Sequence, residues 1–311
     1  MRVLVTGAAG FLGSTLCAAL LARDAEVAGV DAFLPNYDPA VKRANLAELL
    51  GRPRFSFTEA DLRSAPLEPL LGGATHVAHL AALPGVRPSW GGAFGDYAAH
   101  NVLATQRLLE AARGAGLARI VVASSSSVYG ACGETPAAEE TARRPISPYG
   151  VTKLAAEALV YAYRESLGVP AVAIRYFTVY GPRQRPDMAF HRFFEAARLG
   201  RPVTVYGDGE QRRDFTYVDD AVAATVVGLT QPSPDFAYNV GGGHSASVNE
   251  VLDRMERVTG RAIARDQAPT PPGDPRRTSA DTTRARRDWG YAPRTRLEEG
   301  LALQWEWQRK R

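Results

Sequence analysis

Two side chains that could move a proton together, Tyr149 and Lys153, stand four residues apart in the chain. Positions i and i+4 lie on one face of a helix, and a neighbouring ammonium favours a phenolate over a phenol. A free tyrosine has a pKa of ~10, so Tyr149 becomes a general base near neutral pH only if Lys153 and a second cation lower that pKa. Because a Tyr-x-x-x-Lys pattern also occurs by chance on solvated helices, its meaning depends on the rest of the chain.

A glycine-rich turn near the start of the chain supplies that context. The apolar run from Arg2 to Thr6 predicts a buried parallel strand, and glycines follow it at intervals of three residues. Gly7 allows a tight turn, Gly10 lets backbone amides approach a pyrophosphate, and Gly13 allows the next helix to pack closely. The N-terminus of that helix attracts the anion. The turn therefore predicts a dinucleotide site, whose expected residues here also include Ala9, Phe11 and Leu12.

An acidic residue ends the second predicted strand, over residues 26–31. The carboxylate of Asp31 lies at the separation from the glycines at which it would accept hydrogen bonds from an adenosine ribose and repel a 2′-phosphate. The sequence therefore predicts NAD rather than NADP as the cofactor. The charged nicotinamide is then the second cation that Tyr149 needs.

Strand-like and helix-like runs alternate along the first part of the chain. Strand-like runs lie at residues 55–57, 76–80, 120–123 and 171–174, and helix-like runs lie at residues 101–113 and 149–166. This alternation predicts an α/β fold with a Rossmann-type, doubly wound parallel sheet. After Thr178, prolines and a glycine run interrupt shorter elements, which predicts a second, smaller α/β lobe.

These patterns predict two domains with a ligand cleft between them. We expect residues 1–177 to form the NAD-binding domain, which includes Tyr149 and Lys153. Residues 178–311 are expected to form mainly the substrate-binding lobe, with a segment that could return to the first domain.

The composition limits the class of protein. With 311 residues, 45% of them hydrophobic and 23% charged, the chain suits a soluble α/β protein with a large core. The sequence contains no apolar stretch long enough to cross a bilayer, and the first strand begins at the second residue, so we expect no membrane partner, no targeting segment and a cytoplasmic location.

The two cysteines are too few for a disulfide framework. The net charge of +4 is scattered along the chain, which argues against a nucleic-acid partner, and the histidines lack the spacing of a metal site, so we expect no metal.

Several motifs in the same order resemble the extended short-chain dehydrogenase/reductases of the nucleotide-sugar epimerase and dehydratase group. Besides the glycine turn and the Tyr149 motif, they are Asp61-Leu62, residues 79–82, 101–105, 124–130 and 213–220. The resemblance implies that Asp61 and Leu62 contact adenine and that Ala81 and Ala82 line the cofactor groove. By the same resemblance, the further cofactor-binding residues are Asn101, Ser124 and Tyr176. Asn101 could instead satisfy backbone groups.

In enzymes of this group, the tyrosine removes the C4 hydroxyl proton of a sugar as hydride passes to NAD. Return of hydride to the other face of the 4-keto sugar inverts C4 without net redox change. The resemblance implies that a hydroxyl of Ser125 relays the proton to Tyr149, although Ser126 or Ser127 could take that place. Dehydratases of the group carry an Asp-Glu pair where this chain has Ser127-Val128. The absence of both acids favours 4-epimerisation.

The stretch from Arg175 to Met188 resembles that of UDP-glucuronate 4-epimerases, as do Gly85-Val86-Arg87 and the serine run. It implies a sugar acid whose carboxylate meets Thr178, Ser126 and Ser127, with Arg185 adding charge-assisted bonds. Arg185 could also be an ordinary surface arginine.

For the nucleotide, we expect Arg213 and Arg276 to clamp the diphosphate, because guanidinium groups match phosphate oxygens with two parallel donors. Arg277 is the alternative to Arg276. Val205 and Arg87 are the remaining expected substrate contacts, and the helices near residues 101–113 and 149–166 resemble those of homodimers in this group. Two other functions remain open, namely 4-epimerisation of a neutral UDP-hexose or a TDP-sugar, and a non-catalytic NAD-binding sensor.

Overall fold

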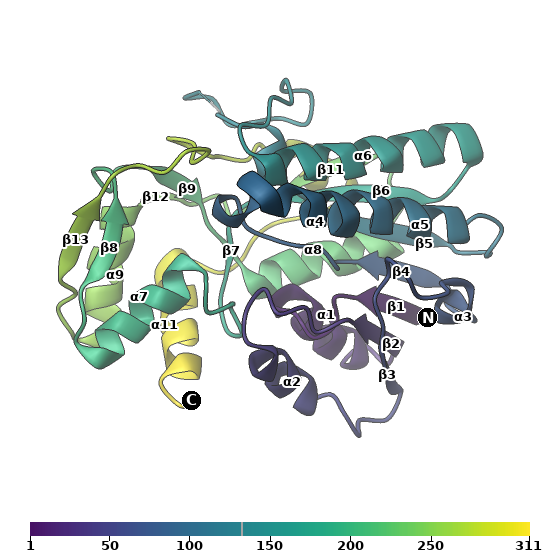
Figure 1. The fold of residues 1–311 in the computed structure, drawn as a ribbon, viewed down its shortest axis with the longest axis horizontal. Coiled ribbons are helices and arrows are strands. Elements are labelled where there is room, and N and C mark those ends of the chain that lie inside the picture. The colour runs from purple at the N-terminus through teal and green to yellow at the C-terminus, as the bar shows by residue number, and fades with distance from the viewer. Residues whose placement is uncertain (132) are drawn as a thin grey trace.

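The large sheet of the protein is parallel throughout and has seven strands. The computed structural model describes residues 1–131 and 133–311. Of the two cysteines, Cys132 lies outside the described residues and Cys17 is a buried free thiol. The strands follow the order β11-β6-β5-β4-β1-β2-β3 (Figure 1). Their bounds are β1 (Arg2–Thr6), β2 (Glu26–Asp31), β3 (Phe55–Glu59), β4 (His76–His79), β5 (Arg119–Ser125), β6 (Ala171–Tyr176) and β11 (Ala237–Val240). The predicted doubly wound sheet is confirmed.

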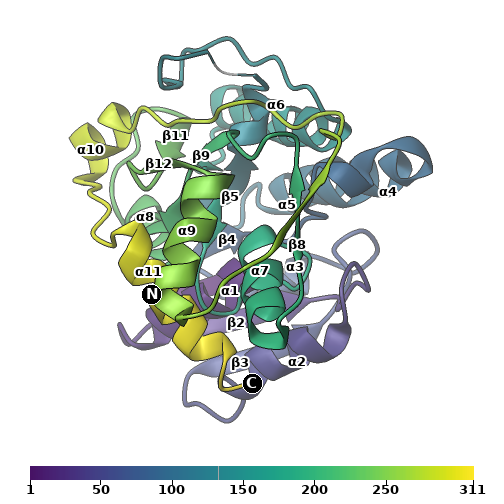
Figure 2. The ribbon, with the colours of Figure 1, turned by 90° about the vertical axis from the view of Figure 1, so that its left-hand side faces the viewer.

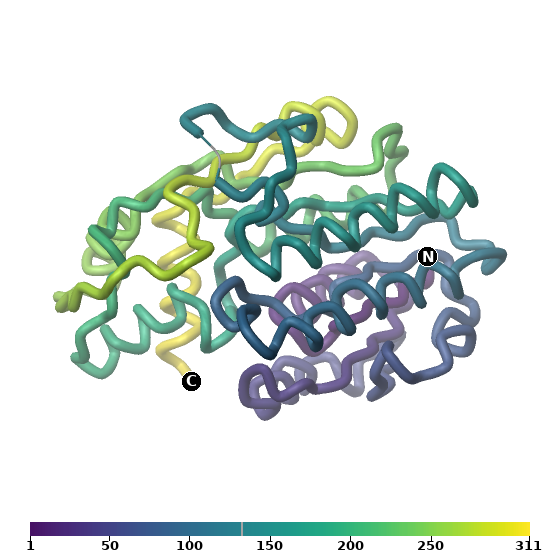
Figure 3. The backbone as a smooth tube through the Cα atoms, turned by 45° about the horizontal axis from the view of Figure 1, so that its top comes forward, coloured from purple at the N-terminus to yellow at the C-terminus, as the bar shows by residue number. Residues whose placement is uncertain are grey.

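Helices cover both faces of this sheet. The first strand shows why, because Val3 and Val5 pack into one apolar core and Leu4 packs into the other. Helices α5 and α6 lie side by side on one face (Figure 3), and α1 and α8 pack together on the other. The helices of this half are α1 (Phe11–Leu21), α2 (Pro39–Ala47), α3 (Glu68–Leu71), α4 (Phe94–Ala98), α5 (Ala104–Ala111), α6 (Pro148–Leu167), α8 (Val218–Thr230) and α10 (Thr283–Trp289).

Helix α5 starts later than the pattern predicts. A π-helical turn over Ala99–Leu103 joins α4 to α5, so the expected helix at residues 101–113 begins within this turn. Asn101 lies in this turn, and its buried side chain bonds the backbone of Leu83 on both sides: Nδ2 donates to the carbonyl at 3.0 Å and Oδ1 accepts from the N–H at 2.7 Å. Such turns often occur near functional sites.

A smaller lobe stands beyond the carboxyl ends of the strands (Figure 2). It contains three two-stranded sheets, which pair β7 with β10, β8 with β13, and β9 with β12. Their bounds are β7 (Val179–Tyr180), β8 (Val203–Tyr206), β9 (Arg212–Asp214), β10 (Thr216–Tyr217), β12 (Ser245–Ser247) and β13 (Arg265–Ala268), and the helices are α7 (Ala189–Leu199), α9 (Val248–Thr259) and α11 (Leu297–Gln308).

The chain returns from this lobe to the large sheet, where β11 pairs in parallel with β6. The division after residue 177 stays a prediction. Within the described ranges, the helices include none that is long and apolar enough to cross a bilayer.

Candidate active site

A cavity opens at the carboxyl ends of the central strands, where the glycine turn lies. Gly7 has a φ of +72°, and a Cβ there would stand 2.8 Å from the backbone nitrogen of Ala81. A Cβ on Gly13 would stand 2.0 Å from the carbonyl oxygen of Gly7. Both positions therefore require glycine, because strand, turn and helix are in backbone contact. No side chain of the described residues caps the first turn of α1, so its N–H groups can serve an anion.

The cavity collects most of the residues predicted to bind the cofactor, together with the predicted relay Ser125. They are Gly7, Gly10, Phe11, Leu12, Gly13, Asp31, Asp61, Leu62, Ala81, Ala82, Ser124, Ser125, Tyr149, Lys153 and Tyr176. Ala9 lies behind the turn and donates its N–H to the Asp31 carboxylate at 3.1 Å. Asn101 lies behind the wall, where it also donates to the hydroxyl of Thr152 at 3.0 Å. The structure therefore supports the backbone alternative for Asn101.

The backbone holds Asp31 in place. Phe33 donates a second N–H to this carboxylate at 2.8 Å, and the side chain is nearly buried. Three residues of this wall, Asn36, Tyr37 and Lys42, were not expected from the sequence. Lys42 donates to the Asn36 side chain and to a backbone carbonyl, so it stiffens the loop beside Asp31. The spacing of these residues after the second strand was the only signal that could have found them.

Tyr149 lies in the first turn of α6, whose position several contacts fix. Ser147 caps the helix by accepting from the Gly150 N–H at 3.1 Å, and the Tyr149 N–H donates to Ser89 Oγ at 3.1 Å. A Cβ on Gly150 would stand 2.6 Å from the carbonyl oxygen of Ser127. The start of α6 therefore packs directly on the serine segment.

The serine segment turns sharply after β5. Ser125 Oγ accepts the Ser127 N–H at 3.1 Å and so caps the 3-10 turn over Ser126–Val128. Ser125 reaches the cofactor cavity. Ser126 and Ser127 are half-buried on the turn and are not among the described residues that line either this cavity or the one below. The geometry thus favours Ser125 among the candidate relays.

Burial dominates the electrostatics of the catalytic pair. It raises the pKa of the Tyr149 phenol, while a hydrogen bond from Ser125 and the charge of Arg185 lower it. Burial also lowers the pKa of Lys153 to about 8, and its ammonium donates to the Ala123 carbonyl at 2.9 Å. The sequence predicted that Lys153 and the nicotinamide together lower the pKa of Tyr149, and this stays a prediction. Among the described residues, Arg185 is the cation whose charge lowers that pKa in this structure.

A second cavity lies in the smaller lobe, between α7, β8 and β9. It contains the expected substrate residues Arg87, Thr178, Arg185, Val205 and Arg213. Arg185 and Met188 also line the cofactor cavity, so the two cavities adjoin.

Three arginines of this second cavity are paired with carboxylates. Arg213 donates to Asp274, and Arg87 stands 3.9 Å from the same carboxylate while its guanidinium lies 3.9 Å from the ring centre of Tyr206. Arg185 forms a bidentate pair with Asp187 at 2.9 and 3.0 Å. Asp274 was not expected as a partner from the sequence, although it stands in the segment before Arg276.

Arg276 lies away from both cavities. Its side chain is 65% exposed and forms a bidentate pair with Asp208, and Arg277 pairs with Glu134. A role for either arginine at the diphosphate stays a prediction.

The fold and the site together define an NAD-binding enzyme of the short-chain dehydrogenase/reductase type. Residues 3–241 match the NAD dependent epimerase/dehydratase family, and the chain belongs to this family. The predicted family, with NAD as its cofactor, is confirmed.

Named relatives cover almost the full chain. The chain is 46% identical over 303 residues to the uncharacterized UDP-glucose epimerase YtcB of Bacillus subtilis (strain 168), covering 97% of this chain and 96% of the relative. It is 36% identical to the UDP-glucuronate 4-epimerase of Thermodesulfobacterium geofontis (strain OPF15), covering 99% and 96%. The crystal structure of UDP-glucuronic acid 4-epimerase from Bacillus cereus in complex with UDP-glucuronic acid and NAD is similar with a TM-score of 0.96 at 40% identity, covering 100% of this chain and 99% of that one.

Proposed function

We propose that the protein converts UDP-glucuronate to UDP-galacturonate by NAD-dependent 4-epimerisation. One observation carries this proposal, namely the close likeness to the Bacillus cereus enzyme, whose crystal structure contains UDP-glucuronic acid and NAD. The local geometry agrees with it, because Tyr149 and Ser125 line the cofactor cavity and Arg185 lines both cavities.

NAD, when bound, supplies the group that accepts hydride from C4 of the sugar and returns it. The protein supplies the proton chemistry. Tyr149 takes the C4 hydroxyl proton and gives it back after the sugar turns its other face, and Ser125 bridges the hydroxyl and the phenol. Lys153 positions the ribose of the cofactor beside Tyr149. Because hydride is returned in every cycle, the reaction consumes no NAD.

The sugar carboxylate is the proposed ligand of the polar groups next to Tyr149. Arg185 supplies charge, and Thr178 supplies a hydroxyl in the same cavity. Ser126 and Ser127 are proposed to donate to the carboxylate from their turn. Held in this way, the carboxylate resists loss of CO2 from the 4-keto acid.

A second candidate is the 4-epimerisation of neutral UDP-glucose, because the Bacillus subtilis relative named for that sugar shares 46% identity with this chain. Proton NMR separates the two candidates when purified protein is incubated with each UDP-sugar and no added cofactor. Galacto-configured UDP-galacturonate supports the first, and turnover of UDP-glucose alone supports the second. A pentose product would contradict the proposed hold on the carboxylate, and no turnover of any nucleotide sugar would favour a sensor.

The proton role of Tyr149 is tested by removing one oxygen. Tyr149→Phe is expected to lower kcat by about 10³-fold or more while the protein retains NAD, because general base catalysis is lost but the cavity wall stays. NMR measures turnover, and the absorbance of NAD released on denaturation measures cofactor content. Tyr163→Phe, which changes a tyrosine further along α6, is the matched control. Turnover of Tyr149→Phe at the unaltered rate would rule out the mechanism.

The same proposal includes a homodimer in the cytoplasm, where pools of NAD and nucleotide sugars are found. Five large apolar side chains on α4, the π-helical turn and α6 are exposed, namely Phe94, Leu103, Val151, Tyr161 and Leu167. Helices α5 and α6 stand side by side there (Figure 3), so a second copy could cover this face. Light scattering of the purified protein tests this state, and a monomer at micromolar concentration would contradict it.

A further inference from the structure

A fully buried ion pair joins the helix of Tyr149 to the neighbouring strand. Glu157 of α6 and Arg175 of β6 have exposed side-chain fractions of 0% and 1%. Arg175 binds the carboxylate with two nitrogens, and its Nε donates to Glu157 Oε2 at 2.9 Å. Glu157 follows Tyr149 by eight residues and Lys153 by four, so all three share one face of α6.

The pair holds both ends of the segment that carries the candidate relay serines. At the near end, Ser124 Oγ donates to Glu157 Oε2 at 2.8 Å, and Ser124 lines the cofactor cavity. At the far end, Arg175 Nη1 donates to the hydroxyl oxygen of Tyr129 at 2.6 Å. Ser125 lies between these two anchors, and in the sheet register Ser124 pairs with Arg175.

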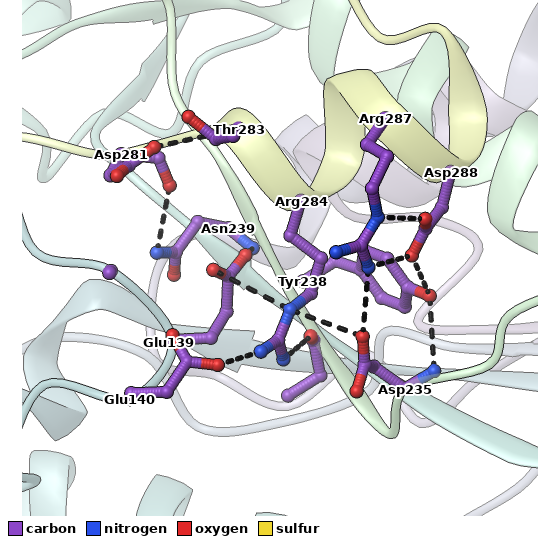
Figure 4. A network of polar contacts seen from close by, with 12 residues as sticks. Glu139, Glu140, Asp235, Tyr238, Asn239, Asp281, Thr283, Arg284, Arg287 and Asp288 are labelled. Carbon is purple, nitrogen blue, oxygen red and sulfur yellow. Dashed lines mark hydrogen bonds and ion pairs between the residues drawn. The ribbon is translucent and has the colours of Figure 1, made fainter.

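The C-terminal part of the chain completes the network. Tyr129 donates its hydroxyl to Asn239 Oδ1 at 2.7 Å, and the Asn239 N–H donates to Glu139 at 2.7 Å. Figure 4 shows the outer part, where Arg284 of α10 faces Glu139 and Asp235. Elements from residues 235–288 therefore support the segment from behind.

Stability alone does not account for this arrangement. Desolvation of two charges offsets most of their attraction, and well-packed apolar residues often replace such a pair without loss. The pair instead contributes orientation, because two parallel hydrogen bonds from a guanidinium fix the angle between the two side chains as well as the distance between them. Here those angles set the position of the Ser124–Tyr129 segment relative to α6.

We propose that Glu157 and Arg175 are positioning residues for proton transfer, which hold the Ser125 hydroxyl within hydrogen-bonding reach of the Tyr149 phenol. This inference rests on the proposed epimerase mechanism but not on the identity of the sugar. Without the pair, the segment shifts, Ser125 no longer assists the phenolate, and Tyr149 needs a higher pH to act as a base.

The main test replaces both charges at once, so that no lone charge is buried. Glu157→Met/Arg175→Met is expected to fold and keep NAD, to lower kcat roughly tenfold or more with KM within about twofold, and to move the acidic limb of the kcat profile to higher pH. Arg143→Ala is the matched control, because Arg143 contacts the same carboxylate at 3.3 Å from a side chain that is 39% exposed. This control should keep the unaltered kcat and profile. A folded double variant with unaltered kcat and pH profile would overturn the proposal.

If the double variant does not fold, a milder variant still tests the positioning role. Tyr129→Phe removes only the hydroxyl that Arg175 holds, and we expect a roughly threefold to tenfold lower kcat and the same direction of pH shift. An unaltered kcat and profile in Tyr129→Phe would overturn the proposal. Rescue of kcat at high pH would support positioning, because a merely destabilised protein gains nothing there.

A spectroscopic titration separates this inference from the proposed function. The tyrosinate absorbance of Tyr149, obtained by subtracting the matching Tyr149→Phe protein, needs no turnover. If no nucleotide sugar reacts, the proposed function fails, yet a higher pKa of Tyr149 in Tyr129→Phe would still support the positioning role. An unchanged pKa would overturn it.

Discussion

The two cavities that meet at Arg185 are built in opposite ways. The cofactor cavity has the glycine turn and small apolar residues as walls, and backbone N–H groups hold its Asp31 carboxylate. The substrate cavity has arginines that carboxylates already neutralise, as Asp274 does for Arg213. A dinucleotide is thus expected to meet hydrogen-bond donors that the backbone already positions. An anionic substrate is expected to compete with an acidic side chain for the arginines. We therefore expect affinity to depend on backbone packing in one cavity and on charge competition in the other.

The largest expected effect comes from adding a side chain at the glycine turn of the cofactor cavity, where the backbone leaves no room for one. A methyl group on Gly13 would stand 2.0 Å from the Gly7 carbonyl oxygen, and only a backbone shift can relieve that contact. Gly13→Ala is expected to lose bound NAD and, with it, nearly all turnover, which the absorbance of released NAD and the NMR assay measure. Gly95→Ala is the control, because a methyl group there meets open space. Full NAD content in Gly13→Ala would show that the cavity is not preformed by packing.

A smaller effect is expected from removing the competing acid of the substrate cavity. Asp274→Asn takes away a negative charge beside Arg213 and Arg87. A unit charge at ~4 Å contributes about 1 kcal/mol in water, so we expect UDP to bind roughly fivefold more tightly, with a steeper dependence on salt. Titration calorimetry measures the affinity. Glu306→Gln on α11, which breaks an exposed pair with Arg309, should leave it unchanged. Weaker binding in Asp274→Asn would mean that the acid contacts the nucleotide itself.

The smallest effect concerns the buried cation of the cofactor cavity. Burial lowers the pKa of Lys153 to about 8, against ~10.4 in an unfolded chain. Between these pH values the unfolded chain binds a proton that the folded protein has released, so the unfolding free energy rises with pH. Well below pH 8 both states bind the proton, so the cost of burying the charge stays constant there. The Tm of the unaltered protein minus that of Lys153→Met should therefore increase by about 2–4 °C from pH 8 to pH 10. Calorimetry measures the difference, and Lys310→Met is the exposed control. A difference that falls with pH would contradict the burial of the charge.

The cofactor cavity was the more predictable of the two because its features are local. Gly7, Gly10 and Gly13 form one turn, and Tyr149 and Lys153 lie on one helix, so spacing alone predicted their proximity. Asp274 follows Arg213 by 61 residues, and nothing in their spacing indicates that they pair. Such a pair depends on how β9 and the segment near residue 274 fold together.

Asn101 and Arg276 show that a motif does not predict the contacts of a side chain. Each stands in a recognisable motif, yet Asn101 bonds the backbone of Leu83 and Arg276 faces solvent beside Asp208. A motif predicts which residue occupies a position, whereas the direction of a long or amide side chain follows from the neighbours that the fold provides.

Strand β11 affects how the chain folds during its synthesis. Ala237–Val240 pairs with β6 at the edge of the large sheet, although the other six strands end by Tyr176. While a ribosome still holds residue 237, β6 is an open edge that can pair with a neighbouring nascent chain. The large sheet is therefore completed only late in synthesis. A fragment of the chain that ends before residue 237 would keep β6 as an unpaired strand edge, which can pair with other chains.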